Sequence, residues 1–575
     1  MLRKQLLVII TLMTVMPFAL SAKKKAPKPD ENPIFTNVEY YGQDSIYINN
    51  PLGEDEFYNP ILQGCYPDPA ICKKGDDYYL VCSSFVMMPG CPIFHSKDLV
   101  NWRQIGHVLD RPSQLHVTNS GTSQGMMAPG ITYNPHNDTF YMITTVYMIT
   151  TVDGNFVVKA KDPAGPWSDT IRLGFSGIDP SLFFDDDGKA YIVHNDAPKQ
   201  AFWNGHRTIR IWEYDVANDK LVPNSDHVIV NGGTKFHKKP FWIEAPHIYK
   251  KDGKYYLMCA EGGTGDTHSE VVFMSDNPTG PYIEAPSNPV LTQRYLDPQR
   301  KEKVDWTGHS DIVQGPDGKW YGVFLAIRPN VNDRTVTGRE TFMLPVDWSG
   351  KWPIFENGLI PIEPKLKLPR GVKNMTGTNG FLPQGNFGFK DDLIADTLDF
   401  RWVGLRTMID SVARHTPFGL RLLTNNHNIT ENRPLSAAWT RQIHNDFSFS
   451  TDLLYRPRNE KDLAGIACIQ SNKFNYVFGI TRKGKTDYIV LQRTANGISN
   501  IVASLPIDNF NGKIALKVSA ADDMYRFAYS LDNGKTYTYL GAPQSGDILS
   551  TDIAGGFVGN MLGLYSTSNN TAIPQ

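Results

Sequence analysis

The sequence predicts an all-β chain in which a five-bladed β-propeller is followed by a C-terminal β-sandwich. The 575 residues include 48 Gly and 39 Pro, and 11% are aromatic, a mixture that favours many short strands joined by tight turns. One hairpin signature recurs five times before residue 360, and strand patterns without that repeat follow it. A chain of this length is expected to form two or three domains.

The recurring hairpin consists of a polar turn followed by paired aromatic or apolar residues. A tyrosine closes each copy, at Tyr79, Tyr141, Tyr191, Tyr256 and Tyr321. Asp-Gly turns precede the last three, and glycine supplies the positive φ that a tight hairpin turn needs. Five β units without helical periodicity between them predict five blades over residues 51–360. The alternative is an irregular β-sandwich in which the hairpins recur by chance.

The N-terminus has the features of an export signal. Arg3 and Lys4 precede a mostly apolar run, and residues 19–22 are small, so residues 1–22 are predicted to be a cleaved signal peptide, with a buried N-terminal helix as the alternative. The apolar run is too short to span a bilayer, and no cysteine follows it to carry a lipid anchor. We expect a periplasmic or secreted protein without a membrane anchor, beginning with a linker over residues 23–50.

Charge, composition and strand patterns indicate which partners the protein excludes and what its second domain is. A net charge of −2 argues against nucleic acid as a partner. Residues 361–380 are rich in Pro, Gly and Lys and are predicted to be a linker, and residues 381–575 alternate as strands of one sandwich. The sandwich carries no cluster of acids or histidines, so we expect a structural partner, with carbohydrate binding as the alternative. Six cysteines cannot form a disulfide scaffold, and their pairing is left open.

Acidic residues occur at one phase of the hairpin repeat. Asp68, Asp179, Glu244 and His309 lie 11 or 12 residues before a closing tyrosine, and in the second unit this phase falls on Pro129. Residues at one phase of a propeller repeat occupy equivalent places, and the first strand of each blade lines the central channel. We therefore expect three acids and a histidine to converge on one pocket, although they are far apart in sequence.

Three convergent carboxyl groups suit the hydrolysis of a glycosidic bond, in which one takes a proton from water and another protonates the leaving oxygen. Asp68 stands between two prolines and is predicted to be the general base. Glu244 follows an apolar segment and is predicted to be the general acid, and Asp179 is the third charge that raises its pKa. The alternative is a calcium site, because acids and a carbonyl oxygen also bind a hard cation.

The sequence resembles glycoside hydrolase family 43. The resemblance covers most of the chain outside the first 22 residues and rests on seven motifs in order: residues 59–62 (NPIL), 66–71 (YPDPAI), 77–80 (DYYL), 177–181 (GIDPS), 243–247 (IEAPH), 308–311 (GHSD) and 338–341 (GRET). It implies a propeller with a concanavalin-like jelly roll, and an inverting reaction with Asp68 as base, Asp179 as pKa modulator and Glu244 as acid. It further implies that Phe85 stacks beside the sugar, Arg339 contacts its hydroxyls and His309 lies at the pocket floor.

One departure from the family bears on the substrate. Many relatives carry a tryptophan where this chain has Met126-Met127, and a thioether lacks the flat face of a ring. We therefore expect an exo-glycosidase that removes terminal non-reducing α-L-arabinofuranosyl residues from plant hemicellulose or its oligosaccharides. The alternatives are a β-xylosidase of the same family and, in another class, a non-catalytic carbohydrate-binding propeller. No cofactor is required, although the resemblance implies that a hydrated calcium ion could lie beside His309.

Overall fold

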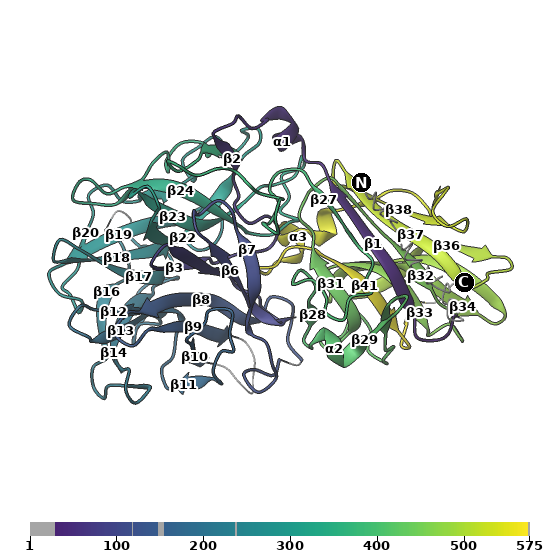
Figure 1. Cartoon of the computed structure of the whole chain (residues 1–575), viewed down its shortest axis with the longest axis horizontal. Coiled ribbons are helices and arrows are strands. Elements are labelled where there is room, and N and C mark those ends of the chain that lie inside the picture. The colour runs from purple at the N-terminus through teal and green to yellow at the C-terminus, as the bar shows by residue number, and fades with distance from the viewer. Residues whose placement is uncertain (1–28, 118, 148–153, 236–237, 573–575) are drawn as a thin grey trace, which may run out of the picture.

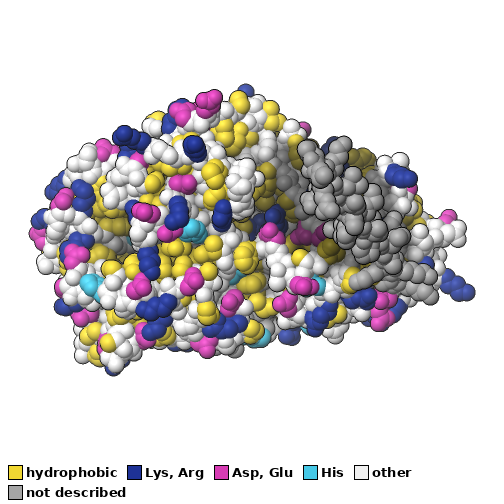
Figure 2. Space-filling view, viewed as in Figure 1, with side chains coloured by type: hydrophobic (Ala, Val, Ile, Leu, Met, Phe, Trp, Pro, Cys, Tyr) yellow, Lys and Arg dark blue, Asp and Glu magenta, His cyan; other side chains and the backbone are white. Residues whose placement is uncertain are grey.

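The computed structural model describes residues 29–117, 119–147, 154–235 and 238–572, so the predicted signal peptide lies outside the described residues. Two β-rich bodies lie side by side, one formed by the first part of the chain and one by the last part (Figure 1). On the face shown in Figure 2, cationic and anionic side chains are interspersed. None of the helices in the described part of the chain has the length and apolar character to cross a membrane.

The first body contains five antiparallel sheets that follow one another along the chain. Their strands are β3 (Ala70–Lys74), β4 (Asp77–Val81), β6 (Gly90–Ser96) and β7 (Arg103–Leu109); β8 (Gly125–Asn134), β9 (Thr139–Tyr147), β10 (Gly154–Ala160) and β11 (Ile171–Leu173); β12 (Ile178–Phe184), β13 (Ala190–Asp196), β14 (Thr208–Asp215), β15 (Lys220–Leu221) and β16 (His227–Asn231); β17 (Glu244–Lys251), β18 (Lys254–Glu261), β19 (Ser269–Ser275), β20 (Ile283–Glu284) and β21 (Leu291–Thr292); and β22 (Asp305–Gln314), β23 (Trp320–Ile327), β24 (Glu340–Asp347) and β25 (Ile354–Phe355). Each closing tyrosine of the sequence repeat lies on the second strand of one sheet.

Hydrogen bonds join each sheet to the next and close the series into a ring. They run from Ala128 N to Ser83 Oγ (2.7 Å), from Thr132 Oγ1 to Leu182 O (2.9 Å), from Ser181 Oγ to Pro246 O (2.6 Å), from Tyr249 OH to Asp311 Oδ1 (2.6 Å) and from Ile71 N to Asp311 Oδ2 (2.8 Å). The last bond connects the fifth sheet to the first. The all-β propeller that the repeat predicted is confirmed.

Asp311→Ala is expected to destabilise the ring, because this carboxylate holds the fourth, fifth and first sheets together. The side chain is only 4% exposed, and its loss leaves the Ile71 amide and the Tyr249 hydroxyl buried without their acceptor. We expect a loss of about 2–4 kcal/mol, measured as a fall of several degrees in the midpoint of thermal unfolding. Asp186→Ala, at an aspartate whose side chain is 86% exposed, should leave the midpoint within about one degree, and an equal fall in both variants would contradict the assignment.

The second body is a sandwich of two antiparallel sheets. The larger has the order β29 (Ala413–Thr416), β30 (Gly419–Leu422), β1 (Ile34–Gly42), β32 (Phe447–Leu454), β37 (Lys513–Ala521), β38 (Met524–Ser530) and β39 (Thr538–Tyr539), with β27 (Gly388–Asp391) on β1 and β40 (Gln544–Ser545) on β38. The smaller has the order β31 (Ser436–Arg441), β41 (Met561–Thr567), β33 (Leu463–Ser471), β34 (Phe474–Lys483), β35 (Thr486–Ala495) and β36 (Ile498–Ile507). The helices of the described residues are short: α1 (Ser45–Asn49), α2 (Ile409–Val412), the 3₁₀ helix η1 (Asp547–Leu549) and α3 (Thr551–Ala554).

The predicted N-terminal linker over residues 23–50 is wrong for strand β1, which lies between β30 and β32 in the sandwich (Figure 1). Phe35, Val38 and Tyr40 of this strand are buried in the sandwich core, so the segment is held by the burial of three large apolar side chains. The propeller is therefore inserted into the sandwich, between its first strand and the rest.

The predicted linker over residues 361–380 is also ordered in part. Strand β26 (Lys365–Lys367) pairs with β2 (Glu56–Tyr58), and Leu366 and Leu368 pack against a core of the propeller. A second short pairing, of β28 (Gly404–Leu405) with β5 (Met87–Met88), joins the two bodies directly.

One hydrophobic cluster is shared between the propeller and the sandwich. Phe85 and Met126 of the propeller and Trp439 and Tyr565 of the sandwich belong to it, and each is at most 1% exposed. The two bodies therefore pack against each other through a shared buried apolar cluster. All six cysteines are buried and free.

Candidate active site

A cavity of about 340 Å³ contains all six residues that the sequence predicted for the site: Asp68, Phe85, Asp179, Glu244, His309 and Arg339. The inner strands of the ring bring them together. Asp179 lies on β12, Glu244 on β17 and His309 on β22, whereas Asp68 lies just before β3 and Arg339 just before β24. Met127 and Ala128 of β8 complete the wall, so every sheet of the ring contributes to the cavity.

The same bulge recurs in four of the five inner strands. Strand pairing skips two residues, and the first of them has a positive φ between 45° and 56°; these first residues are Ala128, Asp179, Ala245 and His309. Asp68 has the same conformation, with a φ of 54°, immediately before β3. A bulge next to an active site redirects a side chain that would otherwise follow the regular pleat.

This backbone comparison corrects one expectation about phase. The residue equivalent to Asp68, Asp179 and His309 is Ala245, and Glu244 stands one residue earlier, still paired with Ala260. A shift of one residue along a strand changes the direction of the side chain. Glu244 therefore approaches the cavity from a different backbone position than the two aspartates.

Asp68 is held as a carboxylate. Its Oδ2 accepts a hydrogen bond from Ser83 Oγ at 2.5 Å, and its Oδ1 accepts one from Arg339 Nη1 at 3.1 Å. Ser83 is itself fixed by the amide of Ala128. Burial favours the protonated form of Asp68. The positive charge of Arg339, the electrostatic effect of His309 and the hydrogen bond from Ser83 together outweigh burial, so the pKa of Asp68 is lowered. An ionised, fixed carboxylate can take a proton from water.

Glu244 is held as a carboxylic acid. Burial and the negative charges of Asp179 and Asp68 raise its pKa well above the ordinary value, although the indole N–H of Trp242, 2.6 Å from Oε2, acts in the opposite direction. Burial and the charge of Asp68 also raise the pKa of Asp179, to about 7, against a hydrogen bond from the Ala245 amide. Near neutrality the coupled pair of Asp179 and Glu244 therefore retains a proton.

Asp179→Asn is expected to move the basic limb of the pH profile of kcat/KM to lower pH, by about one unit. The negative charge of Asp179 helps Glu244 keep its proton, so an uncharged amide lets Glu244 ionise at a lower pH. The check is kcat/KM measured between pH 4 and 9, with Asp186→Asn as the control. A basic limb that stays in place or moves to higher pH would count against this role.

The other three predicted residues are buried around the acids. Burial lowers the pKa of His309 to about 3, so its imidazole is neutral, and its Nδ1, 3.7 Å from Asp68 Oδ1, makes no ion pair at neutral pH. Arg339 is 6% exposed and also donates to Thr264 Oγ1 at 3.0 Å, while its Nε has no acceptor among the described residues. Phe85 is 1% exposed and is fixed by paired backbone hydrogen bonds to Met126.

The surroundings of His309 do not form a calcium site from protein groups. In the described ranges, no three His, Cys, Asp or Glu side chains are grouped so that they could hold a metal ion. The nearby carboxylate of Asp68 is already bound by Ser83 and Arg339. Calcium prefers six to eight oxygen ligands, which these protein groups do not supply, so a hydrated ion beside His309, bound mainly through water, stays a prediction.

Several residues of the site were not predicted, and four of them hold a predicted residue or reach the cavity from the sandwich. Ser83 orients Asp68, Trp242 contacts Glu244 and Thr264 contacts Arg339. Phe557 comes from the sandwich, in the loop before β41, and lines the cavity with its amide held by Ser123 Oγ at 2.9 Å. Trp242 had a signal, since it stands two residues before a predicted catalytic acid, whereas nothing local in the sequence connects Phe557 with the propeller.

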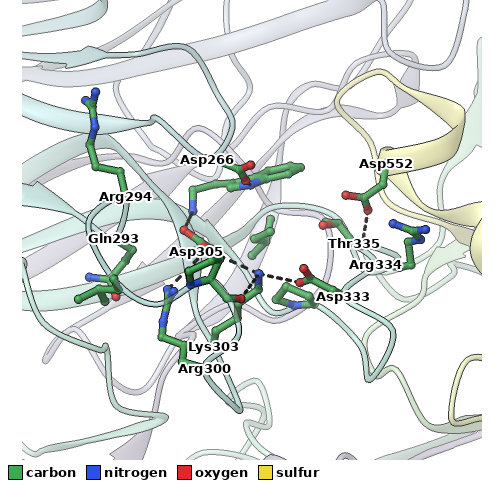
Figure 3. Close-up of a pocket in the computed structure, with 15 residues that line it drawn as sticks. Asp266, Gln293, Arg294, Arg300, Lys303, Asp305, Asp333, Arg334, Thr335 and Asp552 are labelled. Carbon is green, nitrogen blue, oxygen red and sulfur yellow. Dashed lines mark hydrogen bonds and ion pairs between the residues drawn. The ribbon is translucent and has the colours of Figure 1, made fainter.

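A second cavity, of about 240 Å³, does not offer the same chemistry (Figure 3). Its charged side chains are largely paired with one another: Lys303 lies 2.7 Å from Asp333, and Arg300 lies 3.5 Å from Asp305. None of the three acids that share one phase of the hairpin repeat lines this second cavity. The catalytic candidate is therefore the cavity that holds Asp68 and Glu244.

A carboxylate kept ionised and a carboxyl group kept protonated in one cavity meet the requirements for acid–base hydrolysis of a glycosidic bond. Comparison with known proteins agrees. Residues 57–353 match the family model of glycosyl hydrolases family 43, and residues 390–573 match that of the β-xylosidase C-terminal concanavalin A-like domain. The chain belongs to glycosyl hydrolases family 43.

Individual relatives are similar over nearly the whole chain. A "xylosidase/arabinosidase" of Butyrivibrio fibrisolvens is 37% identical over 521 residues, 89% of this chain and 96% of the relative. The "non-reducing end alpha-L-arabinofuranosidase BoGH43B" of Bacteroides ovatus is 34% identical over 91% of this chain and 94% of its own. Among solved structures, a GH43_12 protein from a capybara gut metagenome is 51% identical, with a TM-score of 0.89 over 93% of this chain and 99% of its own.

Proposed function

We propose that the protein is an inverting exo-glycosidase that removes terminal non-reducing α-L-arabinofuranosyl residues from plant hemicellulose or its oligosaccharides. Asp68 takes a proton from a water molecule, whose oxygen attacks the anomeric carbon. The bond from that carbon to the leaving oxygen breaks, and Glu244 gives its proton to the leaving oxygen. The observation that carries the proposal is the opposite effect of one cavity on two carboxyl groups, lowering the pKa of Asp68 and raising that of Glu244.

The remaining parts of the proposal have separate support. The ring of five sheets is, on this view, a five-bladed propeller with the cavity on its axis. Phe557 and Arg339 narrow the cavity on the side of the sandwich, which favours a chain end over a chain interior. The leader-like residues 1–22 support export to the periplasm or the medium, where hemicellulose fragments would be met.

The choice of arabinofuranose over xylopyranose rests on the wall formed by β8. Met127 lines the cavity where the resemblance led us to expect the flat face of a tryptophan, and a flexible thioether accommodates a puckered furanose. A β-xylosidase is the second candidate, favoured by the double name of the Butyrivibrio relative, "xylosidase/arabinosidase".

Kinetics on two matched substrates test the choice. We expect kcat/KM on 4-nitrophenyl α-L-arabinofuranoside to exceed that on 4-nitrophenyl β-D-xylopyranoside. A preference of tenfold or more for the xyloside would replace the first candidate with the second. If the protein hydrolysed neither substrate and no arabinose- or xylose-containing oligosaccharide, both candidates would be overturned.

A further inference from the structure

The wall of the cavity beside Glu244 continues outward as exposed aromatic side chains. Trp242 lines the cavity and donates to Glu244, and Phe241, the next residue outward, lines it as well. Phe241 is 44% exposed, and Phe202, on a neighbouring loop, is 69% exposed. Large apolar side chains exposed at the mouth of a cavity mark a surface that a ligand covers.

Phe241 is fixed in place although nearly half of it is exposed. Gly205 and Gly263, with φ values of +80° and +71°, lie against its ring, and a Cβ built on either would come within 2.1 Å and 3.0 Å of ring carbons. The Phe241 carbonyl accepts from the Gly262 amide at 2.7 Å. Two glycine-containing loops therefore frame the ring, which remains 44% exposed. A ring that is already ordered loses little conformational entropy when a ligand stacks on it.

The loop that carries Phe202 is anchored beside Phe241. Trp203 donates from Nε1 to the carbonyl of Pro240 at 2.6 Å, and the Trp242 amide donates to the carbonyl of Gly205 at 2.8 Å. Within the loop, His206 stacks on Trp203 with 3.9 Å between ring centroids, and Phe202 leans on His206 at 5.8 Å. The exposed Phe202 ring is thus supported by a stack of rings and, unlike Phe241, does not line the cavity that holds Glu244.

The position of the Phe241 and Phe202 rings relative to Glu244 indicates which part of a substrate they contact. Glu244 protonates the leaving oxygen, so groups on its outer side face the sugars that leave. Arg207 lies 4.7 Å from the centre of the Trp242 ring and donates to Asn195, and the exposed rings of Phe241 and Phe202 form an apolar surface outside. Such a surface suits the C–H faces of neutral sugars.

We propose that Phe241 is a stacking platform for the sugar that carries the leaving oxygen, and Phe202 for the next sugar outward. The inference rests on the proposed glycosidase function and adds a substrate class to it. The preferred substrate is a neutral oligosaccharide with at least two sugars beyond the bond that is cleaved. Binding energy from these remote sugars serves the transition state by positioning the leaving oxygen under Glu244.

The test compares chain lengths. For Phe241→Ala, kcat/KM should fall about five- to tenfold on di-, tri- and tetrasaccharides that the wild type cleaves, consistent with the loss of one stacked ring. For Phe202→Ala, the fall should be larger on the tri- and tetrasaccharide than on the disaccharide. Phe241→Tyr keeps the ring face and should stay within twofold of the wild type, which separates stacking from misfolding. Tyr539→Ala, on strand β39 of the sandwich and 63% exposed, is the matched control and should change nothing.

The outcomes separate this inference from the function it rests on. A wild type that cleaves pentosides, with both alanine variants unchanged at every chain length, overturns the platform and leaves the glycosidase assignment intact. A uniform fall at all lengths in Phe202→Ala also overturns the assignment of Phe202 to the outer sugar. A wild type that cleaves no arabinose- or xylose-containing substrate overturns the proposed function itself, and the platform with it.

Discussion

Asp68→Asn is expected to lower kcat by about 10³–10⁴-fold on every substrate, whatever its leaving group, because attack by water always needs a base. Asparagine has nearly the same shape, but its amide has one acceptor oxygen where Asp68 offers two to Ser83 and Arg339, and it cannot take a proton from water. The measurement is kcat on pentosides with good and poor leaving groups, with unfolding midpoints as a check that the variant folds.

Ser83→Ala provides a graded comparison at the same carboxylate. It removes one hydrogen bond to Asp68 and leaves the base in place, so the acid limb of the pH profile should move to higher pH while much of the activity remains. If Asp68→Asn kept more than about a tenth of the wild-type kcat, the base would have to be another group.

Glu244→Gln is expected to affect substrates unequally. A sugar or alkyl leaving group needs a proton, so kcat on such substrates should fall by about 10²–10⁴-fold. A dinitrophenyl leaving group departs as a stable anion and should lose far less. The logarithm of kcat plotted against the pKa of the leaving group should therefore have a steeper slope in the variant. The basic limb of the pH profile should disappear, because that limb reports the loss of the proton from Glu244.

The matched control for this experiment is Asp68→Asn, in which the loss should be similar for every leaving group. An equal loss across all leaving groups in Glu244→Gln would contradict its role as acid.

The propeller and most of the site could be predicted because each part has a local signal. The hairpin turns and closing tyrosines recur at intervals along the chain, so the ring of sheets is visible without any long-range contact. Asp68, Asp179 and His309 occupy one conformation in that repeat, and counting residues back from the tyrosines was enough to find them. Glu244 was found as well, but its offset by one residue was not, because the bulge at Ala245 is a property of the backbone.

The parts that were missed depend on contacts between distant segments. Strand β1 has a strand-like sequence, but it pairs with a strand far along the chain, because Asn37 lies opposite Asp452, 415 residues later. The Pro- and Lys-containing stretch just before β1 therefore suggested a linker. Phe557 reaches the cavity only because the shared apolar cluster fixes the sandwich against the propeller. Such packing leaves no repeat or spacing in the sequence.

The central claim is that Asp68 directs a water molecule at the anomeric carbon in a single displacement. The most direct test follows the hydrolysis of a pentoside by proton NMR and identifies the anomer that forms first, before mutarotation mixes the two. The account predicts that the configuration of this first product is opposite to that of the substrate. A first product with the configuration of the substrate, or a covalent glycosyl intermediate trapped on Asp68, would show a double displacement and contradict it.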